Sequence, residues 1–179
     1  MKKMNSVFIA SSLDGYISDK KGGIDWLHSV PNPNQDDMGY KEFMNRIDAL
    51  VMGRKTFETV LGFGIDWPYE KPVFVLSNSL STVPPHLSEK VLLMNGALKG
   101  ILAQIYDRGL SRLYIDGGST IQNFLKEDLI DEFILTTIPV LIGGGSRLFS
   151  ELDKKLDFEL ESSQVYLNQI VQNRYVRKI

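Results

Sequence analysis

Short, almost continuous apolar runs alternate along this chain with segments whose apolar residues recur at helical spacing. Such runs are typical of strands buried on both faces of a sheet, whereas helical spacing gathers apolar side chains on one face of a helix. Their alternation predicts an α/β fold of three layers, with a mostly parallel central sheet covered on both faces. The strands are expected at residues 7–10, 49–52, 73–76, 91–93, 113–115 and 133–138.

Four helices are expected between these strands. Two have apolar residues at positions i, i+3, i+4 and i+7, and the second is followed by a stop signal at Gly109. Two shorter helices are indicated near Phe57 and Phe124. The two longer patterns consist of Tyr40, Phe43, Met44 and Ile47, and of Leu98, Ile101, Leu102 and Ile105.

The last part of the chain has a different pattern. Leu156, Phe158 and Leu160 alternate with charged residues, and a turn is expected at residues 168–169. This pattern predicts a C-terminal antiparallel hairpin on the edge of the sheet. No repeat or low-complexity linker divides the sequence, so residues 1–179 are expected to form one domain.

The composition excludes several classes of site. The chain has no cysteine and two histidines that are far apart, so neither a disulfide framework nor a metal site is expected. Its 20 basic and 22 acidic residues give a net charge of −2, which does not suit nucleic-acid binding. No leader or membrane-length apolar run is visible. We therefore expect a cytoplasmic protein that acts on a small molecule and contacts neither nucleic acid nor membrane.

Glycines mark two turns between an expected strand and an expected helix. Gly117 and Gly118 follow the strand at 113–115 and precede Ser119 and Thr120, where a helix begins. Glycine lets the backbone approach a ligand closely, and the free N–H groups of a helix N-terminus attract phosphate. These glycines therefore indicate a phosphate site, or else they only make a tight turn.

The second turn, at Gly53, is followed by Arg54, Lys55 and Thr56. Cations in the first turn of a helix are unfavourable unless an anion is bound there, although both side chains could simply be solvated. A third strand end carries Ser77 and Asn78, where open α/β sheets bind ligands, although a plain turn would have the same residues. Together the three strand ends predict a dinucleotide site with room for an additional phosphate.

The order of these motifs resembles the dihydrofolate reductase superfamily. The resemblance is greater to the branch that contains the C-terminal reductase domain of the bifunctional riboflavin-biosynthesis deaminase-reductase (RibD), and it extends over the whole chain. It implies a dihydrofolate reductase-like fold and an NADPH-dependent oxidoreductase. The motifs are residues 7–17, 25–27, 52–57, 76–78, 116–119, 138–145 and 148–149.

The resemblance also implies which residues bind NADPH. Ala10 and Ile17 match positions whose backbone lines the nicotinamide carboxamide, and residues 14–26 match a mobile loop that closes over the ring. The phosphates are assigned to the turn that contains Gly53, Arg54, Lys55 and Thr56, to Ser77 and Asn78 near the 2′-phosphate, and to Gly117, Gly118, Ser119 and Thr120 at the pyrophosphate.

On the substrate side, the resemblance implies three catalytic candidates, Asp37, Thr136 and Trp26. Asp37 lies where dihydrofolate reductases carry the carboxylate that grips the pterin, and Thr136 matches the threonine that supports it. Such a carboxylate can bind an amino-pyrimidine edge and help to deliver a proton as the hydride arrives. A slip of one residue would put Asp36 there instead, and either aspartate is also a natural N-cap for the helix that follows.

The expected activity is hydride transfer from NADPH to a small planar heterocycle that is pterin-, pyrimidine- or dihydrofolate-like. Two alternatives stay open: dihydrofolate reductase proper, and a non-catalytic nucleotide-binding module of the same fold. Lys71 replaces the arginine with which folate enzymes clamp the glutamate tail, and a lysine offers only a point charge. The missing zinc-binding cysteines exclude the bifunctional deaminase-reductase itself. By analogy with this branch, we expect a homodimer that uses the C-terminal strands around residues 167–176.

Overall fold

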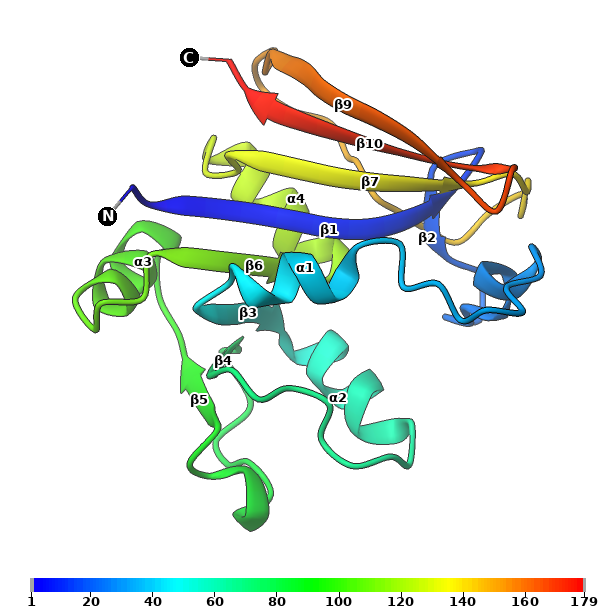
Figure 1. The fold of residues 1–179 in the computed structure, drawn as a ribbon. Coiled ribbons are helices and arrows are strands. Elements are labelled where there is room, and N and C mark those ends of the chain that lie inside the picture. Colours follow the sequence, from blue (N-terminus) through cyan, green and yellow to red (C-terminus); the bar gives the residue numbers. More distant parts are fainter. Residues whose placement is uncertain (1, 179) are drawn as a thin grey trace.

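The computed structural model describes residues 2–178, in which eight strands form one sheet in the order β5-β4-β3-β6-β1-β7-β10-β9 (Figure 1). The first six strands in this order run parallel, β10 is antiparallel to β7, and β9 is antiparallel to β10. The strands are β1 (Met4–Ser12), β3 (Ala49–Gly53), β4 (Val73–Leu76), β5 (Val91–Met94), β6 (Arg112–Asp116), β7 (Glu132–Ile138), β9 (Phe158–Tyr166) and β10 (Ile170–Arg177). The mostly parallel sheet and its C-terminal antiparallel hairpin are thereby confirmed.

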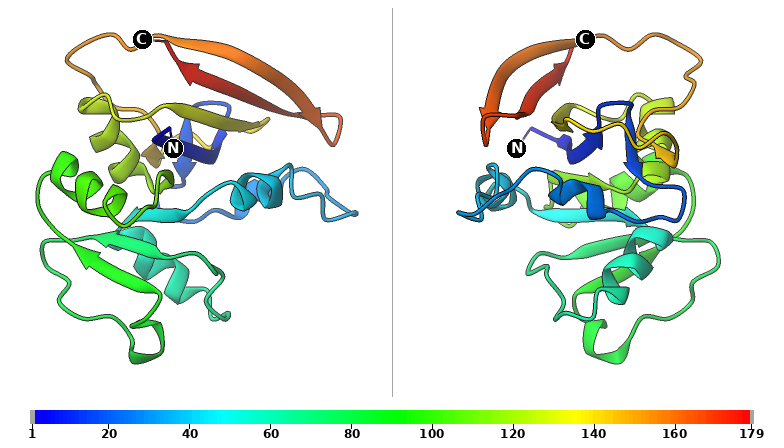
Figure 2. Two further views of the ribbon diagram at one scale, coloured as in Figure 1. Left: turned by 60° about the vertical axis from the view of Figure 1, so that its left-hand side comes forward. Right: turned by 90° about the vertical axis from the view of Figure 1, so that its right-hand side faces the viewer.

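Helices cover both faces of the sheet (Figure 2). In β3, Ala49 and Val51 belong to the core beneath α3 and α4, whereas Leu50 and Met52 belong to the core beneath α1 and α2. This alternation follows from the two-residue period of a strand, and it confirms the three layers. No helix within residues 2–178 is both long and apolar enough to cross a membrane. The helices are α1 (Tyr40–Asn45), α2 (Arg54–Gly62), α3 (Leu98–Tyr106) and α4 (Gly118–Lys126).

Several short elements have no counterpart in the sequence prediction. Strand β2 (Tyr16–Ser18) pairs antiparallel with β8 (Ser146–Arg147), and two 3₁₀ helices, η1 (Asp25–His28) and η2 (Pro85–Leu87), lie in connections. Each has at most four residues, which is too short for an apolar period to be visible.

The β2–β8 ribbon explains the glycines at residues 143–145. Gly145 has a φ of +141°, and a Cβ atom there would lie 1.9 Å from the carbonyl oxygen of Ser18. The Asp14 carboxylate accepts hydrogen bonds from the N–H groups of Ile142 and Gly143. A hydrogen bond from the Ser12 hydroxyl, together with these N–H groups, lowers the pKa of Asp14. The glycine segment at residues 143–145 is therefore hydrogen-bonded to the turn between β1 and β2.

The C-terminal hairpin turns at residues 167–169, where Leu167 and Asn168 have φ values of +50° and +59°. Asparagine tolerates this left-handed conformation better than most residues, which agrees with the expected turn. The hairpin extends the sheet beyond β7, and β9 forms the outer edge.

Candidate functional site

Two helix N-termini lie side by side at the carboxyl edge of the sheet. Strands β3 and β6 are neighbours with Met52 opposite Asp116, and α2 and α4 begin directly after them. The N-cap residues are Gly53 and Gly117, neither helix has a side-chain cap, and neither has an acidic residue in its first turn. The N–H groups of both first turns are therefore free to bind an anion.

The two turns pack against each other through their glycines. A Cβ atom on Gly117 would lie 2.1 Å from Thr56 Oγ1, and one on Gly53 would lie 2.8 Å from Thr120 Oγ1. Gly117 also has a φ of +91°, which side chains rarely adopt. Each glycine thus makes room for a threonine of the opposite helix, and this brings together two motifs that are far apart in the sequence.

Gly118 makes a third close approach, because a Cβ atom there would lie 2.6 Å from Ile17 Cδ1. Strand β2 therefore rests on the N-terminus of α4. The structure thus places Ile17 beside the paired turns.

A groove extends from these turns over the ends of β4 and β5. It consists of two adjoining cavities of about 470 and 250 Å³ that share Arg54, Leu76, Leu98 and Asn123. Arg54 is exposed and forms an ion pair with Glu58, one helical turn later, at 3.3 Å. Hydroxyl, amide and cationic groups thus line an elongated groove that suits a ligand with several phosphates. The expected residues along it are Gly53, Arg54, Lys55, Ser77, Asn78, Ser119 and Thr120.

A separate cavity of about 230 Å³ lies on the α1 side of the sheet, where β1 and β7 end. Ala10 of β1 pairs with Thr136 of β7, and both line the cavity together with Asp37. Trp26 packs into the neighbouring apolar cluster with Ala10, and its buried Nε1 has no hydrogen-bond partner among the residues described. The structure therefore brings the three catalytic candidates to one region.

Asp37 and Thr136 are not hydrogen-bonded to each other. Thr136 Oγ1 accepts a hydrogen bond from Gln172 Nε2 at 2.9 Å, and the same amide donates to the carbonyl oxygen of Met38 at 3.0 Å. No sequence pattern indicates Gln172, because only the pairing of β10 with β7 brings it opposite Thr136.

The Asp37 carboxylate stabilises the start of α1. It accepts hydrogen bonds from the N–H groups of Gly39 and Lys41, each at 3.0 Å, although the N-cap residue itself is Gly39. Asp36 accepts from the N–H of Met38 at 2.8 Å. Both aspartates are exposed, and of the two only Asp37 lines the cavity. Asp37 therefore makes the hydrogen bonds of a helix cap and also lines the cavity.

Asp116 is a further acidic group at this edge, and no role is expected for it from the sequence. It is the last residue of β6, it is half-buried, and its Oδ1 accepts a hydrogen bond from the N–H of Gly117 at 2.8 Å. Burial raises the pKa of Asp116 to about 6, although this hydrogen bond lowers it. The visible signal in the sequence was an aspartate at a strand end just before two glycines.

Comparison with known proteins identifies relatives along the whole chain. Residues 6–172 match the family model of the RibD C-terminal domain. A putative riboflavin biosynthesis protein from Shewanella sp. PV-4 is 56% identical, and its crystal structure superposes with a TM-score of 0.96 over 98% of this chain and 99% of that chain.

Two more distant structures share the fold. A diaminohydroxyphosphoribosylaminopyrimidine deaminase/5-amino-6-(5-phosphoribosylamino)uracil reductase from Thermotoga maritima is 16% identical, with a TM-score of 0.76 over 99% of this chain but only 57% of its own. Dihydrofolate reductase from Enterococcus faecalis, solved in complex with NADP(H), is 20% identical, with a TM-score of 0.63 over 98% of this chain and 97% of its own. The fold is therefore dihydrofolate reductase-like.

Proposed function

This chain belongs to the RibD C-terminal domain family, and we propose from this premise that it is an NADPH-dependent reductase acting on a small planar heterocycle of the pyrimidine or pterin type. The observation that carries the proposal is the pair of uncapped helix N-termini at Gly53 and Gly117, which lie on neighbouring strands.

The residues of the groove fit NADPH. The two glycine turns offer free N–H groups to a pyrophosphate, and Arg54 brings a positive charge to the part of the groove lined by Ser77 and Asn78. A 2′-phosphate would find these groups together. When bound, NADPH supplies the hydride, and the protein contributes position and charge.

The cavity at the end of β1 supports a flat, polar substrate. Its apolar walls include Phe8, Val30 and Ile138, and Thr136 and Asp37 provide hydrogen-bonding groups. Apolar faces combined with a few polar groups are what a planar heterocycle requires. An open cavity beside the expected nicotinamide position favours an enzyme over a module that only binds nucleotide.

The two named reductases suggest which substrates should be tried first. The Thermotoga protein is named for reduction of a phosphoribosylamino-uracil, and the Enterococcus protein for dihydrofolate. Lys71 stands where folate enzymes have an arginine, and a lysine cannot form the two parallel hydrogen bonds that a guanidinium makes to the glutamate carboxylate of folate. Dihydrofolate is therefore the less favoured of the two substrates.

Cofactor binding is the decisive measurement. The purified protein is titrated with NADPH and, in parallel, with NADH, while the fluorescence of Trp26 and Trp67 is followed. We expect saturable binding, tighter for NADPH. Absence of binding of either cofactor at millimolar concentration would refute the proposal. Oxidation of NADPH by the phosphoribosylamino-uracil or by dihydrofolate then distinguishes the two substrate classes.

A further inference from the structure

A second cavity lies beside the 230 Å³ cavity, between α1 and the C-terminal hairpin. Its volume is about 270 Å³, and we call it the hairpin cavity. Phe8 lines both cavities. Gln172 lines the hairpin cavity, and its amide donates hydrogen bonds to Thr136 and Met38, which line the other. The two cavities therefore meet at Phe8 and Gln172.

The hairpin cavity follows α1 away from this junction. Its lining includes Gly39 at the start of α1 and Arg46 at the end, which are about 10 Å apart along the helix. On the hairpin, Arg174 lies two residues beyond Gln172 in β10. Alone, the 230 Å³ cavity is smaller than the ~300–1,000 Å³ of most small-molecule sites, whereas the two cavities together fall within that range. A ring with a side chain would occupy both.

The charges around the hairpin cavity balance one another. Glu132 is fully buried and accepts hydrogen bonds from Arg46 at 2.8 Å and from Arg174 at 2.6 Å. Burial raises the pKa of Glu132, but hydrogen bonds that include these two outweigh burial and lower it, so Glu132 is ionised at neutral pH. Arg174 also pairs with Glu161, and Glu42 lines the cavity. Two guanidinium groups are thus accompanied by three carboxylates, an arrangement that does not favour a further anion.

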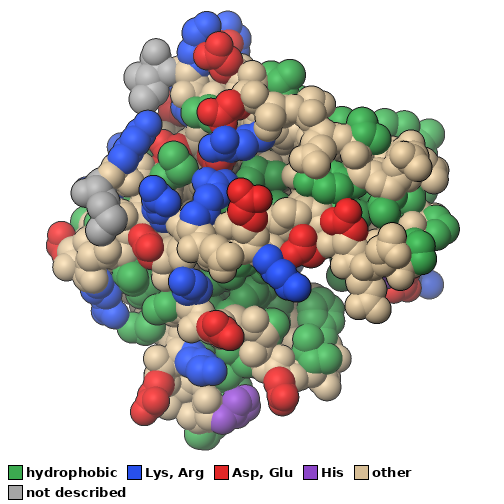
Figure 3. Space-filling model, in the orientation of Figure 1, with side chains coloured by type: hydrophobic (Ala, Val, Ile, Leu, Met, Phe, Trp, Pro, Cys, Tyr) green, Lys and Arg blue, Asp and Glu red, His purple; other side chains and the backbone are tan. Residues whose placement is uncertain are grey.

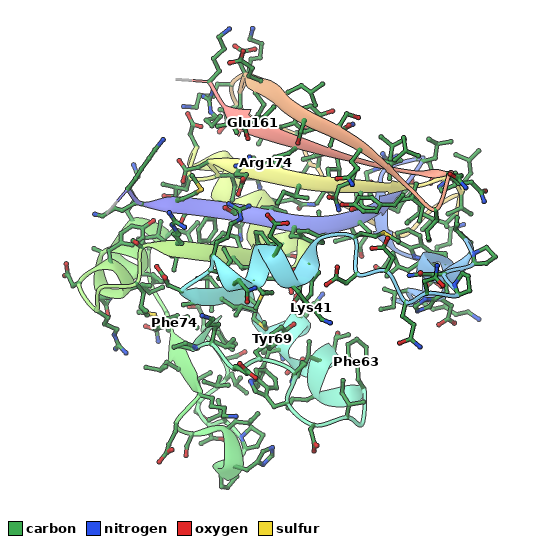
Figure 4. The ribbon with its side chains drawn as sticks, viewed as in Figure 1. Lys41, Phe63, Tyr69, Phe74, Glu161 and Arg174 are labelled. Atoms are coloured by element: carbon green, nitrogen blue, oxygen red, sulfur yellow. The ribbon has the colours of Figure 1, made fainter. Side chains whose placement is uncertain are left out.

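The surroundings of the hairpin cavity agree with this balance. Figure 3 shows basic and acidic side chains interspersed on this face of the molecule. In Figure 4, Glu161 and Arg174 lie on the hairpin, whereas Lys41 lies on the other side of α1 with Tyr69. Lys41 does not line the hairpin cavity, so it adds no positive charge there.

The uncharged polar groups of the hairpin cavity can both donate and accept hydrogen bonds. Ser162, Gln164 and Tyr166 line the hairpin side. Both N–H bonds of the Gln172 amide are used at the junction, so its Oε1 is the atom that can accept from a ligand. Hydroxyl groups on a carbon chain suit these partners, and the C–H groups of such a chain suit apolar side chains. The apolar part of the cavity consists of Phe8, Phe43 and Ile134.

We propose that the hairpin cavity is a second substrate subsite, which takes an uncharged, hydroxylated side chain attached to the heterocycle. The inference rests on the proposed function, and it narrows the substrate to a ring that carries such a side chain. The Thermotoga reductase is named for a substrate with a phosphoribosyl group. The hydroxyl groups of a sugar fit the hairpin cavity of this chain, whereas a phosphate would gain nothing from it.

The first test compares three pterins that differ only in the side chain. They are 6-methyl-7,8-dihydropterin, 7,8-dihydroneopterin with its hydroxylated chain, and the 3′-phosphate of dihydroneopterin. Calorimetry measures their binding to the NADP⁺ complex, in which no turnover occurs. Dihydroneopterin should bind at least ~10-fold more tightly than the methyl compound, because it adds two or three hydrogen bonds. Its phosphate should bind no more tightly. Equal affinity of the first two compounds, or tighter binding of the phosphate, would overturn the proposal.

Two neighbouring serines of β9 provide a matched pair of variants. Ser162 lines the hairpin cavity, whereas Ser163 is on the opposite face of the strand, and both are exposed. Ser162→Leu should remove the preference for dihydroneopterin over the methyl compound, and Ser163→Leu should keep it. Circular dichroism checks that both variants fold. The same preference in both variants would count against the subsite.

The last test does not depend on the ring. Amide NMR signals are followed while the protein is titrated with xylitol, an uncharged polyol, and separately with inorganic phosphate. Xylitol should shift the signals of Ser162 and Gln164 and the side-chain amide of Gln172, and phosphate should leave them in place. No response to xylitol, or a response to phosphate alone, would overturn the proposal even if no pterin binds.

The outcomes separate the two proposals. If the wild type binds and oxidises NADPH but does not distinguish dihydroneopterin from the methyl compound, the hairpin cavity is not a subsite and the proposed function stands. If the wild type binds no NADPH, the proposed function falls, and the substrate role of the hairpin cavity falls with it.

Discussion

Two carboxyl groups at one site differ in what surrounds them. Asp37 lies on the surface with its oxygens on the backbone of α1, whereas Asp116 is half-buried among tyrosines. Asp37 was expected at the site because it occupies the position at which dihydrofolate reductases, which this chain resembles, carry a carboxylate. The burial that raises the pKa of Asp116 comes from elements remote in sequence, so no local pattern could indicate it.

The raised pKa of Asp116 predicts a pH-dependent effect on stability. Its pKa in the folded protein, about 6, exceeds the ordinary 3.8, so folding favours the protonated form. The favourable contribution is complete below pH ~4 and is lost as the pH rises through ~6. At pH ~8, Asp116→Asn should therefore be more stable than the wild type by about 1–3 kcal/mol, and the difference should shrink at pH ~4. Urea unfolding at both pH values measures this.

The matched control for this measurement is Asp128→Asn. Hydrogen bonding from Arg177 lowers the pKa of Asp128 to about 2, so this variant should be less stable than the wild type at pH ~8. Asn also tolerates the φ of +57° at this position. A lower stability for both variants at pH ~8 would contradict the assignment of Asp116 as a carboxyl with a raised pKa.

Arg54 should determine the preference between the two nicotinamide cofactors. If its guanidinium meets the 2′-phosphate, Arg54→Ala should weaken NADPH binding about tenfold and NADH binding far less, because a hydrogen bond to a charged group contributes ~1.5–3 kcal/mol. Glu58→Ala removes only the ion-pair partner and should keep the preference. Equal losses for the two cofactors on Arg54→Ala would refute the role.

At the scale of elements, two strand–glycine–helix units form the paired glycine turns, and loop glycines lie beside them. The Gly53 and Gly117 turns act as a pair, since each accommodates a threonine of the other unit. Sequence patterns located both turns, but only the adjacency of β3 and β6 shows that they are complementary. The β2–β8 ribbon, with Gly145 against Ser18, extends the same edge.

The glycine loop provides a matched pair of substitutions. Gly143 and Gly145 both have positive φ, but a Cβ atom on Gly143 would meet nothing within 4 Å, whereas one on Gly145 would overlap the Ser18 carbonyl oxygen. Gly143→Ala should cost about 1 kcal/mol from backbone strain alone. Gly145→Ala should cost clearly more and should weaken NADPH binding, because β2 rests on α4. Thermal unfolding and the fluorescence titration measure both effects, and equal effects would contradict this account.

At the scale of the whole molecule, the C-terminal hairpin leaves part of the sheet uncovered. Within residues 2–178, strand β9 pairs only with β10, and the side chains of Leu160 and Val165 are 54% and 61% exposed. Unpaired edges and exposed apolar side chains are common at interfaces between copies of a chain. The homodimer expected from the sequence remains a prediction. The edge expected at residues 167–176 is wrong, because β10 is paired with β7 on one side and with β9 on the other, and we therefore expect the dimer to form at β9.

Sedimentation equilibrium tests the dimer. The chain has a mass of 20.2 kDa, and we expect twice this value for the wild type at micromolar concentration. Val165→Glu should shift the protein to monomer without changing its circular dichroism. Ile65→Glu, at a side chain that is 63% exposed elsewhere, should remain dimeric. A monomeric wild type would disprove the expectation.

The sequence by itself determined the layers, the order of strand and helix, the hairpin and the three strand ends that carry glycine, cation and hydroxyl groups. These features depend on local periodicity and on the conformational freedom of glycine. Both can be recognised from residues that are close together in the sequence. It did not reveal the β2–β8 ribbon, the amide of Gln172 on Thr136, or the burial of Asp116.

The tertiary structure alone decided which of these groups meet. The strand order places β6 between β3 and β1, so Asp116 lies between the Gly53 turn and the strand whose Phe8 and Ala10 line the 230 Å³ cavity. Tyr40, Tyr69 and Tyr114 come from three separate segments, and the Asp116 charge contributes to the raised pKa of each of them. Burial in the assembled fold raises the pKa of Asp116 itself. Desolvation is a property of the assembled fold, and for that reason the raised pKa of Asp116 could not be predicted from its sequence neighbours.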